Sequence, residues 1–256
     1  MAKVFITGSS DGLGLMAARI LIEQGHHVVL HGRNPERAKA ALVAAAGAQG
    51  AVFGDLSDVE ATKRVADQVN ALGRFDAVIH NAGIGYREPR RVDTPSGAPH
   101  VFAINVLAPY ILTALIEPPD RLVYLSSGMH HGVRPRLDDM LWTGRRWEAA
   151  SAYAESKFYD VALAFAVARL WPEVLSNALE PGWVPTRMGG PGAPDDMRKA
   201  PVTQAWLAVS EDTLAQSTGA YFYHQTLREP NASAHDPKVQ HELLDTCRRL
   251  SGVHLD

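Results

Sequence analysis

Short apolar runs rich in β-branched residues alternate with longer helical stretches along most of this chain. The first part reads KVFITG, LGLMAARILIEQG, HHVVLHG, ERAKAALVAAAG and AVFGDL, and the rhythm continues to GAYFYHQ at 219–225. Strands that are apolar throughout and alternate with helices predict a parallel sheet covered on both faces. We therefore expect an α/β Rossmann fold, with one doubly wound parallel sheet of about seven strands and helices on both faces.

The rhythm breaks after the fifth and the sixth predicted strand. The segments GMHHGVRPRLDDMLWTGRRWEAAS (128–151) and MGGPGAPDDMRK (188–199) follow neither a strand nor a helix pattern. Ligands of parallel sheets bind beyond the carboxyl ends of the strands, so both insertions are expected over a ligand, the second as a mobile lid. No repeat or linker divides the chain, and residues 1–256 are expected to form a single NAD(P)-binding domain.

Composition favours a small-molecule partner. A formal net charge of −3 gives no general attraction to nucleic acid or acidic lipid, and no apolar run approaches membrane-spanning length. The single Cys247 excludes an intrachain disulfide and a multi-cysteine zinc site, and the histidines show no metal-ligand spacing, so no metal is expected. We expect a cytoplasmic protein that binds neither nucleic acid nor membrane.

A glycine-rich turn, TGSSDGLG (7–14), follows the first strand and opens a helix. Glycine permits the tight turn and lets backbone N–H groups and the helix N-terminus approach a pyrophosphate. Without a cofactor, the same residues would make an ordinary strand-to-helix loop. The turn is expected to bind cofactor through Gly8, Ser10, Asp11, Gly12, Leu13 and Gly14.

The second strand ends in VVLHGRNPER, where a dinucleotide fold contacts the adenine ribose. An acid there accepts hydrogen bonds from a 2′-hydroxyl, whereas an arginine pairs with a 2′-phosphate. Gly32 is followed by Arg33, which predicts NADP(H) rather than NAD(H) as the cofactor. The alternative is that Arg33 is a solvated surface residue.

Tyr153 and Lys157 lie four residues apart in AYAESKFYDVAL (152–163), on one face of a predicted helix. A phenol is a weak base near neutral pH, and an adjacent ammonium lowers its pKa. The pair can thus exchange a proton with a substrate oxygen during hydride transfer, whereas the structural alternative is a surface pair. Tyr159 has no lysine four residues later, which leaves Tyr153 as the candidate.

TGxxxGxG and YxxxK together resemble the short-chain dehydrogenase/reductases, from Lys3 to about Gly219. The resemblance implies that Asn105 in FAINVLAPYILT and Ser127 in RLVYLSSG complete a catalytic tetrad with Tyr153 and Lys157. Alone, Asn105 would be a core polar group and Ser126 a strand residue facing away. The resemblance further implies cofactor contacts at Asp55, Leu56, Asn81, Ala82, Gly83, Tyr153, Lys157, Pro181, Gly182, Val184 and Thr186.

Within that family, SSGMHHGVRPRLDDM and TGAYFYHQTLREPN resemble the retinol-dehydrogenase-like branch, as a soluble, bacterial-type member. The segment TALIEPPDRLVYL is shorter than in relatives, Ala108 replaces a common glycine, and no membrane-anchoring N-terminus precedes the first strand. Two features stay open. His130 and His131 can line the substrate mouth or form a surface turn, and Trp142 and Trp147, with Arg145 and Arg146, can grip substrate or pack the insertion.

The expected activity is an NADP(H)-dependent interconversion of a carbonyl, aldehyde or ketone, and an alcohol. Tyr153 would be the proton donor and acceptor, Ser127 would orient the substrate oxygen, and Asn105 would link the proton path to solvent. The alternatives are a non-catalytic NADP-binding sensor or regulator and an epimerase or dehydratase of the same fold. A homodimer or homotetramer is expected, because relatives assemble through the helices that carry Asn105 and Tyr153.

Overall fold

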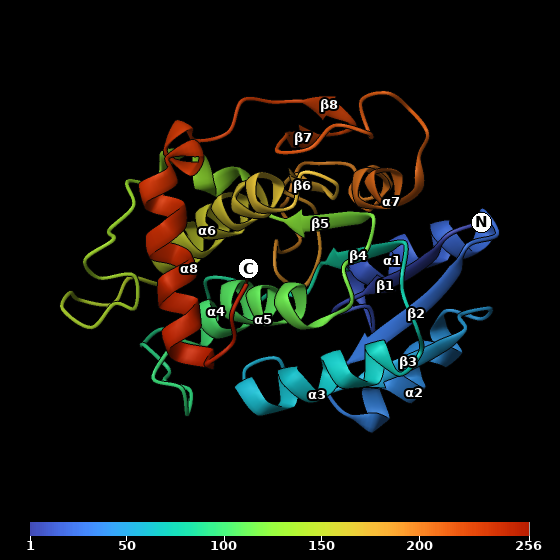
Figure 1. Cartoon of the computed structure of the whole chain (residues 1–256), viewed down its shortest axis with the longest axis horizontal. Helices are drawn as coiled ribbons and strands as arrows, with labels where there is room; N and C mark the ends of the chain where they lie inside the picture. The colour runs from blue at the N-terminus through green and yellow to red at the C-terminus, as the bar shows by residue number, and fades with distance from the viewer. Residues whose placement is uncertain (256) are drawn as a thin grey trace.

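The computed structural model describes residues 1–255, which form one eight-stranded sheet in the order β3-β2-β1-β4-β5-β6-β7-β8 (Figure 1). The strands are β1 (Lys3–Ile6), β2 (His27–Gly32), β3 (Gly50–Phe53), β4 (Ala77–His80), β5 (Arg121–Leu125), β6 (Leu175–Glu180), β7 (Tyr221–Tyr223) and β8 (Thr226–Leu227). Strands β1 to β7 pair in parallel, which confirms the predicted doubly wound sheet. The order reverses between β1 and β4, and open α/β sheets bind their ligands beyond the carboxyl ends of the strands at such a point.

The eighth strand was not predicted. It pairs antiparallel with β7 through a two-residue turn at His224 and Gln225, whose φ angles are +48° and +61°. Positive φ at both central residues is the geometry of a tight hairpin turn, which glycine and asparagine usually supply. Neither residue carries the usual hairpin signature, and Thr226–Leu227 is too short to show strand periodicity.

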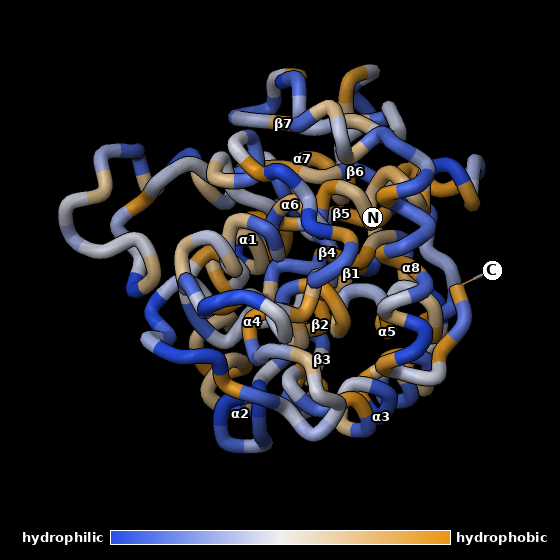
Figure 2. The backbone as a smooth tube through the Cα atoms, turned by 90° about the vertical axis from the view of Figure 1, so that its left-hand side faces the viewer, coloured by the Kyte–Doolittle hydropathy of each residue, from blue (hydrophilic) through white to orange (hydrophobic). Residues whose placement is uncertain are grey.

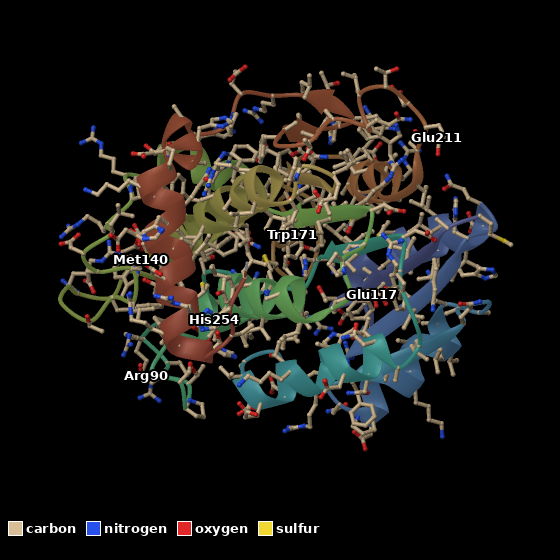
Figure 3. The ribbon with its side chains drawn as sticks, in the orientation of Figure 1. Arg90, Glu117, Met140, Trp171, Glu211 and His254 are labelled. Carbon is tan, nitrogen blue, oxygen red and sulfur yellow. The ribbon has the colours of Figure 1, made fainter. Side chains whose placement is uncertain are left out.

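Helices cover both faces of the sheet because successive strand residues point to opposite sides. Val4 and Ile6 pack under α1 (Gly12–Glu23), α2 (Pro35–Ala44) and α7 (Val202–Val209), whereas Phe5 packs under α3 (Val59–Asn70), α5 (Ala108–Leu115) and α6 (Ala149–Leu170). Figure 2 shows the strands as a hydrophobic centre within more hydrophilic outer turns. Charged side chains such as Arg90, Glu117 and Glu211, labelled in Figure 3, are exposed.

Helix α6 is covered on all sides. Ala152, Tyr153 and every residue from 155 to 167 are buried. Strands β5 and β6 lie on one side of this helix, and α8 (Pro237–Ser251) packs across it on another (Figure 1). A helix buried all round needs no amphipathic stripe, and the sequence of α6 has none.

Helix α8 is amphipathic and turns Val239, Leu243 and Cys247 into the core shared with α6. It ends at Ser251, followed by Gly252 with φ +69° as the C-terminal cap. The short elements are α4 (His100–Phe102), the π-helix η1 (Ala103–Leu107), and the 3₁₀ turns η2 (Gly128–Gly132) and η3 (Ala232–His235). No helix within residues 1–255 is both long and apolar enough to cross a membrane.

Candidate active site

The glycine-rich turn between β1 and α1 is packed against the end of β4. Gly8 has φ +62°, and a Cβ atom there would lie 2.8 Å from the Ala82 Cα. A Cβ at Gly14 would lie 2.4 Å from the Asn81 amide nitrogen, which donates to the carbonyls of Thr7 and Gly8 at 3.0 and 3.2 Å. Asn81 and Ala82 therefore hold the turn in shape from behind.

His31, on β2, is a second support of this turn that sequence reasoning missed. Its Nδ1 accepts a hydrogen bond from the Gly8 N–H at 3.1 Å, so Nε2 carries the proton and donates to the Gly54 carbonyl at 3.0 Å. Burial lowers the pKa of His31 to about 4, which keeps this tautomer neutral. The ring connects the glycine turn with the end of β3, where Asp55 and Leu56 follow. No spacing in the sequence marks it.

The ribose end of the site holds two arginines. The backbone of α2 fills the space beside Gly32, where a Cβ would lie 2.4 Å from the Ala38 nitrogen, so an acidic side chain has no room there. Arg33 is exposed at the end of β2. Arg37, one helical turn later, reaches back to the Asp11 carboxylate at 2.5 Å and the Ser10 hydroxyl at 3.1 Å. Sequence reasoning missed Arg37, although its spacing four residues after Arg33 is a signal.

Asn105 lies in the π-helix η1, so the helix is locally distorted at this residue. Its side-chain oxygen accepts from the Ile84 N–H at 2.8 Å, and its amide nitrogen donates to the Ile84 carbonyl and to the Ser156 hydroxyl at 3.0 and 2.9 Å. The Ser156 hydroxyl in turn donates to the Tyr153 carbonyl. Asn105 thus ties the loop after β4 to the helix that carries Tyr153 and Lys157. Single π-turns of this kind are frequent at functional sites.

Tyr153, Ser127 and Lys157 face one another at the carboxyl end of β5. Burial raises the pKa of the Tyr153 phenol above its ordinary value, while the Lys157 ammonium and the hydrogen-bonded Ser127 hydroxyl act to lower it. Lys157 therefore acts in the predicted direction, but desolvation outweighs it. A Cβ at Gly83 would lie 3.3 Å from the Lys157 ammonium and 3.4 Å from the Asn105 oxygen, so the loop after β4 runs directly past the tetrad.

The Lys157 ammonium is itself held in the core. It donates to the Leu125 carbonyl and to the Asp160 carboxylate, each at 2.8 Å. The neighbouring Ser126 hydroxyl donates to the Lys157 carbonyl at 2.7 Å, so Ser126 supports α6. Asp160 was not singled out in the sequence, because an aspartate three residues after a lysine resembles an ordinary surface pair.

The loop after β6 carries Pro181, Gly182, Val184 and Thr186 at the same edge of the sheet. Gly182 has φ +87°, and Asp195 from the second insertion accepts a hydrogen bond from the Trp183 N–H at 2.6 Å. Thr186 accepts from the Gly189 N–H through its hydroxyl at 3.1 Å. These bonds fold the 188–199 segment back over the carboxyl ends of the strands.

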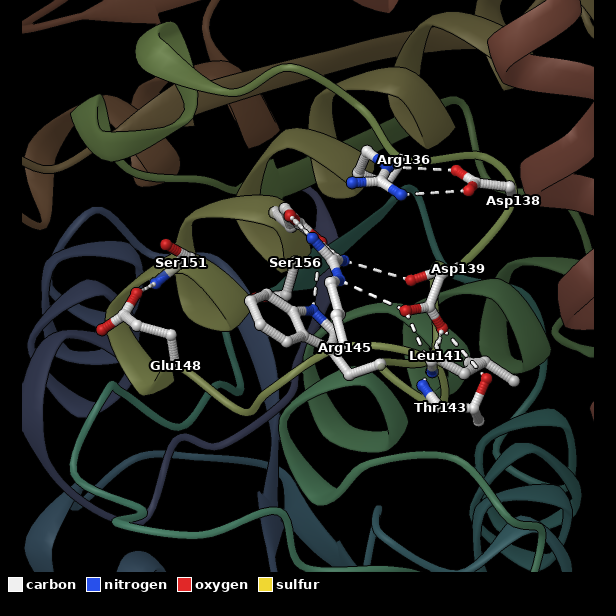
Figure 4. A network of polar contacts seen from close by, with 12 residues as sticks. Arg136, Asp138, Asp139, Leu141, Thr143, Arg145, Glu148, Ser151 and Ser156 are labelled. Carbon is white, nitrogen blue, oxygen red and sulfur yellow. Dashed lines mark hydrogen bonds and ion pairs between the residues drawn. The ribbon is translucent and has the colours of Figure 1, made fainter.

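The first insertion packs on α6 through a charged network (Figure 4). Arg145 makes a bidentate pair with the Glu155 carboxylate at 2.7 and 2.5 Å, and the Trp142 indole N–H donates to the same carboxylate at 3.0 Å. The Arg145 guanidinium stacks over the Trp142 ring, and Trp147 donates to the Glu88 carbonyl. Arg145 and Trp142 therefore pack the insertion onto α6, one of the two alternatives that the sequence had left open, whereas Trp147 also packs against the cluster that contains Tyr153.

Of the two adjacent histidines, His130 follows neither alternative set by the sequence, whereas His131 is half-buried in the turn η2 with its Nε2 3.8 Å from the Glu180 carboxylate. His130 is fully buried, and its Nδ1 donates to the Ser127 carbonyl at 2.7 Å. The Asn231 backbone N–H donates to His130 Nε2 at 3.3 Å. The side-chain amide nitrogen of Asn231 donates to the backbone carbonyls of His130 and His131. This segment fixes the backbone of Ser127 from the side away from Tyr153.

Apolar and aromatic side chains surround Tyr153. The Tyr86 ring lies edge to face against it at 5.5 Å between centroids, and Val101, Trp147 and Met188 complete the cluster. Met188 comes from the second insertion and packs against Gly85. Tyr153 is therefore enclosed by apolar and aromatic side chains from the loop after β4 and from both insertions.

Three comparisons with known proteins agree on one family. The model for short chain dehydrogenase matches residues 2–122. Short-chain dehydrogenase chry4 of Gibberella zeae is 40% identical over 260 residues, covering 100% of this chain and 99% of that protein, and human retinol dehydrogenase 13 is 28% identical, covering 98% and 84%. The crystal structure of a metagenomic short-chain oxidoreductase in complex with NADP has a TM-score of 0.65 and 26% identity, covering 86% and 95%.

Buried neutral histidines predict that stability falls on acidification. Burial lowers the pKa of His31 and His130 to about 4 and that of His80 to about 3, below the ordinary 6.5. The unfolded state then binds more protons from pH 6.5 down to about 4, so the free energy of unfolding drops as pH falls through that window. The shifts of His31 and His80 correspond to roughly 3 to 5 kcal/mol each.

Urea unfolding at pH 7 and pH 5 measures this loss. Asp160 opposes it, because its raised pKa favours the folded state on acidification. His80→Asn should reduce the slope of stability against pH, and His241→Gln, at an exposed position on α8, should leave it unchanged. Equal stability of the wild type at the two pH values would contradict the assignment.

Proposed function

Because this chain belongs to the short-chain dehydrogenase/reductase family of oxidoreductases, we propose that it interconverts a carbonyl compound and its alcohol with NADP(H) as the cofactor. The observation that carries the proposal is the convergence of Ser127, Tyr153, Lys157 and Asn105 at the crevice beyond the strands. A proton donor next to an ammonium at this position is what hydride transfer to a carbonyl requires.

The residues of the cofactor end fit a dinucleotide. Side chains at Gly8 and Gly14 would fill the cradle between the turn and the end of β4, and the N-terminus of α1 points to the same place. Arg33 and Arg37 flank the ribose end, where they favour a 2′-phosphate. The NADP complex of the structural relative described above supports the same cofactor.

In the proposed reduction, the chain's own groups handle the substrate oxygen. When bound, the reduced cofactor supplies the hydride that reaches the carbonyl carbon. The Ser127 hydroxyl donates a hydrogen bond to the substrate oxygen and orients it, and the Tyr153 hydroxyl donates the proton. Lys157 stabilises the resulting phenolate, and its remaining N–H is free for the nicotinamide ribose, since two of its three donors are already used.

Tyr86, Trp147 and Met188 support an apolar or aromatic carbonyl substrate. They contact Tyr153 from the side open to the insertions and bury its ring. The clustering excludes water from the phenol and would strengthen its interactions with the substrate oxygen. The name of the human relative, retinol dehydrogenase, is consistent with an extended apolar substrate.

Removing the proton donor tests the reaction. Tyr153→Phe should lower kcat/KM about 100- to 10,000-fold while NADPH affinity stays nearly unchanged, because the phenol acts on the substrate oxygen. Tyr159→Phe is the matched control: it lies on the same helix, and its hydroxyl has no partner within the described residues. NADPH oxidation with aldehydes, ketones, quinones and retinal measures both variants.

The outcomes separate the alternatives. Retention of most activity by Tyr153→Phe would refute the mechanism. NADPH binding without turnover on any substrate, together with redox-dependent binding of a partner protein, would favour the sensor. Cofactor that copurifies and is never consumed would favour an epimerase or dehydratase.

The two arginines test the cofactor. Arg33→Ala and Arg37→Ala should each weaken NADPH binding about 10- to 100-fold and leave NADH binding unchanged, because each removes one charge-assisted contact to the 2′-phosphate. Arg248→Ala, at an exposed position on α8, serves as the control. Fluorescence titration with both cofactors gives the dissociation constants. Equal loss for NADPH and NADH, or equal affinity of the wild type for both, would contradict the preference.

We propose that the chain does not assemble through the helices that carry Asn105 and Tyr153, contrary to the expectation from the family. Residues 155 to 167 of α6 are buried within one chain, and α8 occupies its outer side. Light scattering gives the mass relative to that of one chain, 27.8 kDa, and in any assembly hydrogen exchange should show no added protection of α6. A dimer in which hydrogen exchange shows added protection of α6 and displacement of α8 would overturn this.

A further inference from the structure

Asp160 is a buried carboxylate that the proposed reaction leaves without a role. It lies on α6 one turn beyond Lys157, and its side chain is 3% exposed. One carboxylate oxygen accepts from the Lys157 ammonium at 2.8 Å, and the other has no hydrogen-bond partner within the described residues. Burying a charged carboxylate with one oxygen unsatisfied is costly, so its retention beside the catalytic lysine calls for a reason.

Among the described residues, Lys157 is the charged group that acts on the Asp160 carboxylate. Tyr124 of β5 is the nearest titratable group outside α6, and its hydroxyl is hydrogen-bonded to Thr113 of α5 at 2.7 Å. His80 of β4 stacks on Tyr124 and is neutral. Strand β6 contributes the uncharged Ser176. Asp160 therefore interacts with Lys157 without a competing ion.

The Lys157 ammonium also acts on the Tyr153 phenol. Lys157 acts to lower the pKa of the phenol, and Asp160 acts to raise it. An ionised Asp160 offsets the lysine charge, whereas a protonated Asp160 leaves the full charge to stabilise the phenolate. Burial raises the pKa of Asp160 to about 7, with Lys157 opposing, so both states occur near neutral pH.

We propose that Asp160 is a positioning residue that sets how much of the Lys157 charge acts on Tyr153, and so sets the pH range over which Tyr153 exchanges its proton. This inference rests on the proposed function for its meaning in catalysis. It concerns three side chains of this chain, however, and can be tested without turnover. Its second consequence is that the protonation steps of Tyr153 and Asp160 are coupled.

The test is a titration of Tyr153 by NMR in protein labelled at tyrosine Cζ, with Tyr153→Phe used to assign the resonance. Asp160→Asn should lower the Tyr153 midpoint by about one pH unit or more, because the lysine charge is no longer offset. Glu155→Gln is the matched control. It removes another buried carboxylate from α6, one that pairs with Arg145 instead of Lys157, and should leave the midpoint unchanged.

Two further results decide the matter. In a Lys157→Met background, Asp160 has no lysine charge to offset, so adding Asp160→Asn should shift the Tyr153 midpoint less than it does in the wild type. If Asp160→Asn does not fold, the wild type still tests the proposal, because its Tyr153 resonance should show a second inflection where Asp160 titrates, near neutral pH. An unchanged midpoint, or a wild-type curve without that inflection, would overturn the proposal.

Activity separates this proposal from the proposed function. If a substrate is found, the pH profile of kcat/KM should shift to lower pH in Asp160→Asn by the same amount as the NMR midpoint. Absence of turnover with a shifted NMR midpoint would refute the carbonyl chemistry and leave the coupling intact. Turnover with identical pH profiles would refute the coupling alone.

Discussion

The structure depends on the burial of α6 from Glu155 to Val167. Polar side chains enclosed between the sheet and α8 are costly unless they find partners. Lys157 finds the Leu125 carbonyl and Asp160, and Ser156 finds Asn105 and its own backbone. These hydrogen bonds fix the rotation of α6 about its axis and its position along that axis relative to β5. The reactive geometry of Tyr153 follows from that fixed position.

Burial also determines the electrostatics. Removing the Tyr153 phenol from water raises its pKa, and only nearby charge and hydrogen bonds oppose this effect. The site therefore needs Lys157 held close, and a buried lysine needs an anion or carbonyl oxygens in return. Asp160 and Leu125 meet that need from the side away from substrate. The same carboxylate that makes the buried ammonium tolerable also limits its effect on the phenol.

The cofactor end shows how much of a site can be predicted from sequence. The alternation of strands and helices, the glycines at 8, 12 and 14, and the Tyr153–Lys157 spacing carry direct geometric meaning, so the sheet and the shared helix of Tyr153 and Lys157 followed from them. Asn105 and Ser127 were expected at the site only from the family resemblance. His31 escaped prediction because its role depends on contacts with Gly8 and Gly54, which are distant from it in sequence. Asp160 escaped because its spacing from Lys157 is that of an ordinary surface pair on a helix. The packing role of Trp142 and Arg145 depends on Glu155, which only the folded insertion brings near. Strand β8 was not predicted, because its two residues are too few to show the alternation typical of a strand.

The central claim is that this crevice transfers a hydride from NADPH to a carbonyl carbon while Tyr153 supplies the proton. The direct measurement is mass spectrometry of the alcohol formed from a reactive carbonyl with NADPH deuterated at both positions of the nicotinamide C4. One deuterium bound to the carbinol carbon in each product molecule is the predicted result. Product that contains no deuterium from the cofactor, or deuterium that is consumed without an alcohol product, would contradict the account.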